Sequence, residues 1–452
     1  MKISRYNDTI AAVATAHGIG SISIIRVSGD KAYSIALKLS KKKSITPRYA
    51  TLSFLYTKDG EPIDEAIIIY FKSPYSFTGE DVVEFQCHGG IAVANLILDE
   101  VIKHGARVAT PGEFSKRAFL NDKIDLTKAE AIAKIIETKS TDAVKILSKQ
   151  LKGELKEFVE SLREELVEIL AYAEVNIDYA EEDLPADLEQ AIVKRLEDIS
   201  KKMQNTLQIS QKKEGLVNGF SISIVGKPNV GKSSLLNRLL NYNRAIISDI
   251  AGTTRDTIEE EIKIGTHLVK IIDTAGVREA KDQIEKIGVQ RAIESIENSD
   301  MVLAVFDGSK KLSEEDEKIL SLLKSFKDSK KIFLFVNKSD LKQELDISKL
   351  EEFEPVLISA KEDVDIVIQS IKRYLDTQGI DDDIILTSKR QMAELKRSLE
   401  AIQRAFEPLE EGELELFAYE INEAISHISS ITRDFERDEI LDKMFGSFCL
   451  GK

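Results

Sequence analysis

Cysteine is scarce in this chain of 452 residues, which contains only Cys87 and Cys449. Two cysteines cannot build a disulfide framework, and they lack the clustering of a metal site. No apolar run approaches the roughly 18 residues that a membrane-spanning helix needs. Asp8 and His17 stand where a signal peptide would require an unbroken apolar segment. We therefore expect a cytoplasmic protein without a membrane segment, in which Cys87 is a small buried hydrophobe.

An excess of basic residues is also missing, since 63 Lys and Arg stand against 78 Asp and Glu and give a formal net charge of −15. Proteins that bind nucleic acid through their whole surface are typically basic. Any contact with RNA must therefore come from a local basic patch. Low-complexity tracts and repeats of fixed period are absent as well, and 42% hydrophobic residues suffice for ordinary cores.

The N-terminal residues 1–120 mix strand-like and helical patterns. Strand-like runs cover 21–27 and 66–71, and an apolar helical period covers 91–101. These patterns predict a compact α/β domain.

Residues 121–215 repeat apolar side chains at spacings of three and four among Glu and Lys, which is typical of long amphipathic helices. A turn is expected at Asp183–Pro185, because proline lacks an amide donor and disfavours helical geometry in its predecessor. The helical pattern returns in residues 380–452. One amphipathic helix cannot bury its apolar stripe alone, so we expect both helical stretches to pack together as one discontinuous domain.

Residues 216–379 alternate strand-like runs with helical stretches, which predicts an inserted domain with a doubly wound, mostly parallel sheet. The strand-like runs are 222–225, 269–272, 301–306, 332–336 and 356–358.

The stretch Gly226–Ser233 reads GKPNVGKS and fits the phosphate-loop pattern G-x-x-x-x-G-K-[ST] between a strand and a helix. The loop amides and the positive end of the helix dipole would hold the β-phosphate. Lys232 would reach the β- and γ-phosphates, and the Ser233 hydroxyl would bind Mg²⁺. Taken alone, the motif leaves a chance match by a glycine-rich turn as the alternative.

Three further motifs follow apolar runs in the order expected of a GTPase. The stretch Asp273–Gly276 (DTAG) would supply an aspartate that reaches Mg²⁺ through water and a glycine amide that faces the γ-phosphate. Asn337–Asp340 (NKSD) and Ser359–Lys361 (SAK) follow later strands. A carboxylate at Asp340 can accept hydrogen bonds from N1 and the exocyclic amino group of guanine, a pattern that adenine lacks. The ligand should therefore be GTP rather than ATP.

The segment Ser248–Asp256 lies between the phosphate loop and the DTAG motif. One of its threonines should add a hydroxyl to Mg²⁺ only when the γ-phosphate is present, which would make the segment an order–disorder switch. A solvated loop is the alternative for Thr253 and Arg255. Val277 stands where a Ras-like enzyme carries the glutamine that orients the attacking water. The catalytic group must therefore come from elsewhere.

Essentially the whole chain resembles the MnmE (TrmE) family of tRNA-modifying GTPases. Besides the nucleotide motifs, the resemblance rests on Glu84–Gly90 (EFQCHGG), Phe119–Leu126 (FLNDKIDL), Gly252–Asp256 (GTTRD) and Phe448–Lys452 (FCLGK). It implies three parts: an N-terminal folate-binding-like domain that makes a homodimer, a discontinuous helical domain, and an inserted Ras-like P-loop GTPase domain.

The resemblance also implies the reaction. Together with an FAD-containing MnmG-type partner in a heterotetramer, the chain would add a carboxymethylaminomethyl or aminomethyl group to C5 of the wobble uridine of tRNA. The carbon would come from a tetrahydrofolate derivative, the 5,10-methylene or 5-formyl form. Residues matching the family's folate contacts are Arg26, Glu84, Lys123 and Lys452. A carboxylate such as Glu84 can accept the paired donors of a pterin ring, although solvated side chains are the plain alternative.

The family further implies how hydrolysis is completed. Two GTPase domains approach across the dimer and enclose K⁺ where other GTPases place an arginine finger. The implied K⁺ ligands are the Asn229 side chain and the carbonyls of Ser248, Ile250 and Thr253, and the Mg²⁺ ligands are Ser233 and Thr254. The expected GTP contacts are Asn229, Val230, Gly231, Lys232, Ser233, Ser234, Ser248, Thr253, Thr254, Asp273, Thr274, Ala275, Gly276, Asn337, Lys338, Asp340, Ser359, Ala360 and Lys361.

Four residues are the candidates for catalysis. Glu285 matches the family's acidic residue that helps to position water, and Asp273 and Thr254 serve the metal. Cys449 matches a cysteine that the family places near the folate and the uridine carbon, and its chemical step stays open. A solvated carboxylate and an inert terminal thiol are the plain alternatives for Glu285 and Cys449.

Two other functions remain open at this point. A ribosome-assembly GTPase that binds ribosomal RNA would share the nucleotide motifs, but the chain has neither a KH-type Gly-x-x-Gly loop nor a basic tail. An aminomethyltransferase with an incidental GTPase insertion would modify its substrate without hydrolysing GTP.

Overall fold

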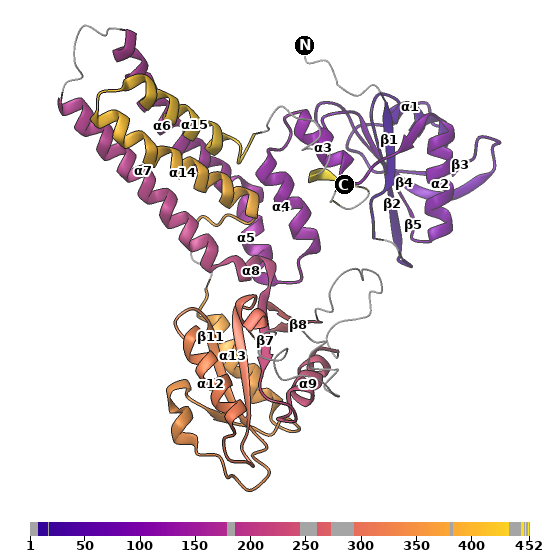
Figure 1. The fold of residues 1–452 in the computed structure, drawn as a ribbon. Helices are drawn as coiled ribbons and strands as arrows, with labels where there is room; N and C mark the ends of the chain where they lie inside the picture. Colours follow the sequence, from indigo (N-terminus) through magenta and orange to yellow (C-terminus); the bar gives the residue numbers. More distant parts are fainter. Residues whose placement is uncertain are drawn as a thin grey trace. The chain divides into compact units, whose positions relative to one another are not determined.

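The computed structural model describes residues 8–16, 18–178, 186–244, 260–272, 293–379 and 383–433, together with 444–446, 448 and 451. The chain divides into two compact units (Figure 1). Unit 1 comprises residues 1–134, 150–196 and 393–452, and unit 2 comprises residues 135–149 and 197–392. The predicted domain limits at 120, 215 and 379 remain predictions.

A six-stranded sheet organises the N-terminal part of unit 1, with strand order β3-β4-β5-β2-β1-β6. Every neighbouring pair is antiparallel except β1 and β6, which are parallel. The strands are β1 (Thr9–Val13), β2 (Ile22–Ser28), β3 (Thr51–Tyr56), β4 (Pro62–Phe71), β5 (Val82–His88) and β6 (Ala106–Val108). The α/β character predicted for this region is thus observed.

Two helices, α1 (Ala32–Ser40) and α2 (Ile91–Lys103), pack on one face of this sheet and share an apolar core with its strands. Cys87 belongs to that core and is 2% exposed, and burial raises the pKa of its thiol to about 11. Cys87 is therefore the buried apolar side chain that the sequence predicted. Helix α3 (Glu113–Leu120) contributes Phe114 to a separate cluster with Ile10.

Further helices lie in the sequence before residue 220 and after residue 379. They are α4 (Leu126–Glu137), α5 (Thr141–Lys152), α6 (Glu154–Asp178), α7 (Ala186–Lys212), α8 (Glu214–Asn218), α14 (Lys389–Glu410) and α15 (Leu414–Ser429). Within unit 1, α6 packs against α15, and Arg433 donates to Glu160 at 2.9 Å. Ser398 of α14 donates to the carbonyl of Ala424 in α15 at 2.8 Å. Helices from before and after the inserted region therefore pack together, as the amphipathic patterns predicted.

The second six-stranded sheet lies in unit 2, with order β12-β11-β10-β7-β9-β8. Its strands are β7 (Phe220–Val225), β8 (Glu260–Ile264), β9 (His267–Ile271), β10 (Met301–Asp307), β11 (Lys331–Asn337) and β12 (Val356–Leu357). All pairs are parallel except the β8–β9 hairpin. The sheet is therefore mostly parallel, as predicted.

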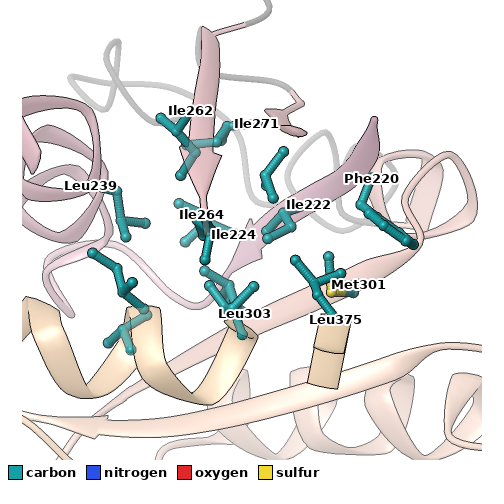
Figure 2. Close-up of a cluster of buried hydrophobic side chains, with 14 of the residues drawn as sticks. Phe220, Ile222, Ile224, Leu239, Ile262, Ile264, Ile271, Met301, Leu303 and Leu375 are labelled. Carbon is teal, nitrogen blue, oxygen red and sulfur yellow. The ribbon is translucent and has the colours of Figure 1, made fainter. Parts of the chain in front are cut away.

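Helices cover both faces of this sheet. Successive side chains of β10 accordingly alternate between two apolar cores. Its residues 301, 303 and 305 belong to a core shared with α9 (Lys232–Arg244) and α13 (Val364–Asp376) (Figure 2). Residues 302, 304 and 306 belong to a second core, on the opposite face, with α12 (Glu314–Phe326) and the 3₁₀ helix η1 (Ile347–Phe353). A strand buried on both faces explains its continuous apolar run.

Three local features differ from the sequence pattern. Strand β8 was not predicted, because its sequence, EEIKI, is short and largely charged. The apolar series from Leu151 to Ile169 is interrupted at Gly153, whose φ of 102° separates α5 from α6. The stretch before β7 forms the short helix α8, for which no prediction was made. The turn predicted at Asp183–Pro185 lies outside the described residues.

Among the helices of the described residues, none has the length and apolar character that a membrane crossing requires.

Phe335 tests the core of unit 2, since it is fully buried on β11. Replacing Phe335 by Ala should lower the free energy of unfolding of this unit by about 3–5 kcal/mol, because a cavity adds to the lost transfer free energy. Urea denaturation followed by circular dichroism measures this change. Ile366→Ala, at a side chain that is 40% exposed on α13, is the control and should cost about 1 kcal/mol or less. Equal losses for both variants would contradict the assigned core.

Candidate functional site

The carboxyl ends of parallel strands gather three of the predicted nucleotide motifs at one edge of the unit 2 sheet. The phosphate loop follows β7, Asn337 ends β11, and Ser359 comes two residues after β12. Parallel pairing fixes this arrangement, because Ala304 of β10 stands opposite both Val225 and Leu334. Ligands of open α/β sheets bind outside the carboxyl ends of the strands. This edge is therefore the candidate nucleotide site.

The phosphate loop takes backbone conformations that its glycines permit. Gly226 has φ 154°, and a Cβ there would lie 2.4 Å from the carbonyl oxygen of Val305. Gly231 has φ 106°, and a Cβ there would meet Asn337 Nδ2 at 2.1 Å. Asn229 has φ 65°, a region that asparagine tolerates better than most residues. Any side chain at Gly226 or Gly231 would thus displace the loop from the strands behind it.

Lys232 opens helix α9 and folds its side chain back into the loop. Its ammonium donates to the carbonyl oxygens of Gly226 at 2.6 Å and Lys227 at 2.8 Å. Burial lowers the pKa of Lys232 to about 8. No carboxylate among the described residues pairs with this ammonium. Such a charge under a phosphate loop is well suited to an anion, which would restore the stability of the ammonium form.

Asn337 joins three of the four predicted motifs through one side-chain amide. Its Nδ2 donates to the Val230 carbonyl in the phosphate loop at 2.6 Å. Its Oδ1 accepts from the Ala360 amide in the SAK motif at 2.7 Å. Asn337 is 3% exposed, so both partners satisfy polar atoms that water cannot reach. The structure thus brings together the phosphate loop, the NKSD motif and the SAK motif.

Two other residues of the NKSD motif differ in their surroundings: Lys338 is ion-paired, and Asp340 is exposed. Lys338, with φ 68°, forms an ion pair with Asp307 at 2.6 Å. This pair holds the pKa of Asp307 below its usual range, against the opposing effect of burial. Asp340 is exposed, and its carboxylate has no hydrogen-bond or ion-pair partner among the described residues. A carboxylate in this setting is free to accept hydrogen bonds from a base.

Two supporting contacts were not predicted from the sequence. Asp307 is the last residue of β10 and directly follows the predicted run 301–306, and an acidic residue at the carboxyl end of a parallel strand was the available signal. Lys227 of the phosphate loop pairs with Asp316 at 2.5 Å and donates to Ser313 at 3.1 Å. Ser313 and Asp316 form the capping box of α12, so this helix start also anchors the loop.

Several predicted site residues lie outside the described residues. They are Ser248, Ile250, Thr253, Thr254, Asp273, Thr274, Ala275, Gly276, Glu285, Cys449 and Lys452, together with Arg255 and Val277. Their assignments stay predictions. Within the described phosphate loop and α9, Asn229, Ser233 and Ser234 line the accessible side, and Val230 is buried. Lys361 is exposed next to the buried Ser359 and Ala360.

Two of the predicted folate residues form an ion pair in unit 1. Arg26 of β2 and Glu84 of β5 are register partners, and their side chains meet at 2.9 Å. The guanidinium of Arg26 also lies 5.8 Å from the ring centres of Phe77 and Phe114. Lys123 lies elsewhere in the same unit and is exposed, close to Gly79.

The C-terminal segment returns to this domain. Phe445 packs with Phe119, Ile124 and Phe448, so two of the stretches that carried the family resemblance meet. A Cβ at Gly451 would lie 2.4 Å from the Val13 carbonyl, at the end of β1. Strand β1 pairs with β2, the strand that carries Arg26. The described part of the terminus therefore lies close to the strand of one predicted folate residue.

A cleft of about 1090 Å³ lies in unit 1, between the loops around Gly79 and Asn121–Asp125 and the chain around Gly153. Four lysines in its wall make no side-chain hydrogen bond or ion pair among the described residues, namely Lys123, Lys128, Lys152 and Lys156. Its acids are largely engaged; Glu80 pairs with Arg117, for example, and Glu160 with Arg433. Asp30, Asp81, Asp122 and Asp125 also line the cleft, so its acidic and basic side chains balance in number, and Arg26 and Glu84 are not among its lining residues.

A mostly parallel sheet with a phosphate loop, an NKSD motif and an SAK motif along one edge defines a P-loop GTPase. The family profile described as MnmE helical domain matches residues 126–449, and the one described as GTP-binding protein TrmE N-terminus matches residues 9–123. The chain belongs to the MnmE family of tRNA modification GTPases.

Relatives match along nearly the whole chain. The tRNA modification GTPase MnmE of Aliarcobacter butzleri (strain RM4018) is 59% identical over 446 residues, covering 99% of each chain. That of Sulfurimonas denitrificans (strain ATCC 33889 / DSM 1251) is 58% identical over 445 residues, covering 98% of this chain and 99% of the relative. Among solved structures, Era in complex with MgGDPNP and nucleotides 1506–1542 of 16S ribosomal RNA matches 40% of this chain and 66% of its own, with 24% identity. Its TM-score of 0.26 is too low to bear on the fold.

The lowered pKa of Lys232 predicts a pH dependence of nucleotide binding. Below pH 8 the ammonium is already charged, so the affinity for GDP should change little. Above pH 8 binding must first protonate the amine, and the affinity should fall by up to about tenfold per pH unit until the pKa of the bound state is reached. Calorimetric titration between pH 7 and pH 9.5 measures this slope. Lys232→Arg, which stays charged throughout, should flatten it; the same slope in both proteins would contradict the assignment.

Proposed function

We propose that this chain is a potassium-activated GTP hydrolase that drives the folate-dependent modification of the wobble uridine of tRNA together with a flavoprotein partner. Full-length family membership, combined with the joining of three nucleotide motifs at Asn337, carries the proposal. The partner is an FAD-containing protein of the MnmG type. The product is a carboxymethylaminomethyl or aminomethyl group on C5 of the uridine.

Guanine is selected at Asp340. The exposed carboxylate accepts from N1 and the exocyclic amino group of the base, and adenine would leave that charge without donors. Lys338 supports the base side of the site from its ion pair with Asp307. The SAK motif is fixed beside this side of the site, because the Ala360 amide donates to Asn337 Oδ1 and the Ser359 amide donates to Asp363 Oδ2.

The phosphate side of the site depends on the loop and the start of α9. The positive φ angles of Gly226, Asn229 and Gly231 are those of a loop that turns backbone amides towards a bound anion. Lys232 lies within reach of that anion, and the Ser233 hydroxyl, in the first turn of α9, suits a hard cation such as Mg²⁺. Thr254 completes the Mg²⁺ site, with Asp273 reaching it through water, when the γ-phosphate is present.

Hydrolysis requires a second group, because Val277 cannot orient water. K⁺ held by the Asn229 side chain and by the carbonyls of Ser248, Ile250 and Thr253 supplies positive charge between the β- and γ-phosphates. The side chain of Asn229 is exposed and makes no hydrogen bond among the described residues, which leaves its oxygen available as a ligand. Glu285 helps to position the attacking water. Pairing of two GTPase domains in the homodimer completes this site.

The modification chemistry belongs to the N-terminal domain, which has the folate-binding-like fold and makes the homodimer. A tetrahydrofolate derivative, in the 5,10-methylene or 5-formyl form, supplies the carbon. Glu84 accepts from the pterin ring, Arg26 or Lys123 meets anionic parts of the ligand, and Lys452 is a further folate contact. The closeness of Gly451 to the end of β1 supports a role for the neighbouring Cys449 and Lys452 in this site. The chain, its flavoprotein partner and the tRNA meet in the cytoplasm.

Alkali-ion dependence tests the hydrolytic mechanism. GTP turnover should be at least about tenfold faster in potassium chloride than in sodium chloride of equal ionic strength, because Na⁺ is too small for the ligand cage. An arginine finger in the same place accelerates hydrolysis by about 10³- to 10⁵-fold, and this range is the upper limit for the rate advantage of potassium over sodium. Phosphate release by the full-length protein measures the two rates. Asn229→Ala should reduce the potassium advantage, and equal rates in both salts for the parent protein would exclude this mechanism.

Substitution of Cys449 tests the modification reaction separately from GTP hydrolysis. Cys449→Ser should leave potassium-stimulated GTP turnover within about twofold of the parent protein, because the residue lies outside the GTPase motifs. The modified nucleoside should be lost from tRNA, as measured by nucleoside analysis of tRNA from a strain that carries only this variant. Cys87→Ser serves as the matched control for loss of a thiol, with the modification retained. Full modification in the Cys449→Ser strain would remove the residue from the mechanism.

A further inference from the structure

The hairpin β8–β9 occupies a distinctive place in the sequence of unit 2. Strand β8 begins at Glu260, four residues after the GTTRD segment, and β9 ends at Ile271, two residues before Asp273. In the proposed function, these two flanking segments are the ones that respond to the γ-phosphate. Each of these segments is therefore close in sequence to one strand of the hairpin.

The turn of the hairpin lies at the amino-terminal end of β9, whereas the nucleotide motifs lie at the carboxyl ends of the parallel strands. Strand β9 runs parallel to β7, with Val269 opposite Phe220, so His267 at its start is remote from the phosphate loop that follows β7. Five residues of strand span about 17 Å. A shift of the hairpin would therefore also move its turn at Gly265 and Thr266, which lies at the opposite ends of the strands from the phosphate loop.

This turn is bonded to the first turn of helix α5. The Thr266 hydroxyl donates to Asp142 Oδ2 at 2.6 Å, and the Thr266 carbonyl accepts from the Thr141 amide and the Ser140 hydroxyl, both at 3.2 Å. Ile146 of α5 is buried in the core of the same sheet. All of these contacts lie within unit 2.

His267 adds polar contacts to the junction. Its Nδ1 lies 3.3 Å from Asp142 Oδ2 and its Nε2 lies 3.3 Å from Asp376 Oδ1 on α13. Nδ1 makes no hydrogen bond among the described residues, so its approach to Asp142 is a close polar contact only. His267 is 5% exposed and Asp142 is 6% exposed. Buried polar groups of this kind are costly to separate and gain little over apolar packing, which favours a positioning role over a purely stabilising one.

Helix α5 leads from this junction to the cleft of unit 1. Its twelve residues span about 18 Å. Its last two residues, Leu151 and Lys152, line the cleft that also contains Lys123, one of the predicted folate residues. One helix therefore has its first turn bonded to the hairpin between the two GTP-responsive segments and its last turn in the wall of that cleft.

We propose that the junction of Thr266 and His267 with Asp142 is the coupling contact through which the nucleotide state controls the modification reaction. Asp142, Thr266 and His267 are positioning residues in this scheme, and none of them touches GTP or folate. The inference rests on the proposed function and adds the route by which GTP hydrolysis reaches the second site.

Matched substitutions at Thr266 test the coupling. Thr266→Val keeps the shape and removes the hydroxyl, whereas Thr266→Ser keeps the hydroxyl. Thr266→Val and Asp142→Asn should retain GTP turnover within about twofold while the modified nucleoside in tRNA falls at least about tenfold. Thr266→Ser should stay near the parent value. Asp346→Asn, the same chemical change at an exposed cap of η1, should have no effect.

Hydrogen exchange gives a readout that a purely structural role would not change. In the parent protein, amides of α5 should exchange at different rates with GDP and with a non-hydrolysable GTP analogue, and Thr266→Val should abolish the difference. Identical exchange with both nucleotides in the parent protein would overturn the inference without any variant. So would full modification by a Thr266→Val protein, or loss of its GTP turnover at an unchanged melting temperature. A parent protein that hydrolyses GTP but leaves tRNA unmodified would refute the proposed function instead, while the exchange measurement still decides the coupling.

Discussion

The side-chain amide of Asn337 is the interaction on which the nucleotide site depends. It satisfies the Val230 carbonyl and the Ala360 amide at once, in a place that water does not reach. Gly231 must be glycine because a Cβ would occupy the position of Asn337 Nδ2. Loss of the amide would leave two buried polar groups unsatisfied, at about 1–3 kcal/mol each. The parallel register of β7, β10 and β11 makes this contact possible, since it sets the loop and the two later motifs at the same edge.

Unit 1 depends on a comparable meeting of distant segments. The carbonyl of Phe445 would lie 2.1 Å from a Cβ at Gly112, so the C-terminal segment passes directly over the start of α3. The rings of Phe119, Phe445 and Phe448 then enclose the contact. Residues near the C-terminus and residues of the N-terminal domain thus form one apolar cluster, although they lie far apart in the sequence.

The sequence predicted those parts of the fold that local patterns determine. The phosphate loop, the apolar run of β10 and the amphipathic series of α14 depend on neighbouring residues, and each is present in the structure. Strand β8 was missed because three of its five residues are charged, so its sequence lacks a clear apolar pattern. Its strand conformation is seen in its antiparallel pairing with β9. The Lys227–Asp316 and Thr266–Asp142 contacts join residues 89 and 124 positions apart. No periodicity reveals such pairs, because the register of sheets and helices creates them.

The four lysines of the cleft stand in a chain whose formal net charge is −15. Screening reduces the reach of their field to about 8 Å at physiological ionic strength. The acidic side chains in the same wall balance the basic ones in number, so each lysine acts on a ligand only at short range. A ligand in the recess is therefore held by individual lysine contacts and is not drawn in by the net field of the protein.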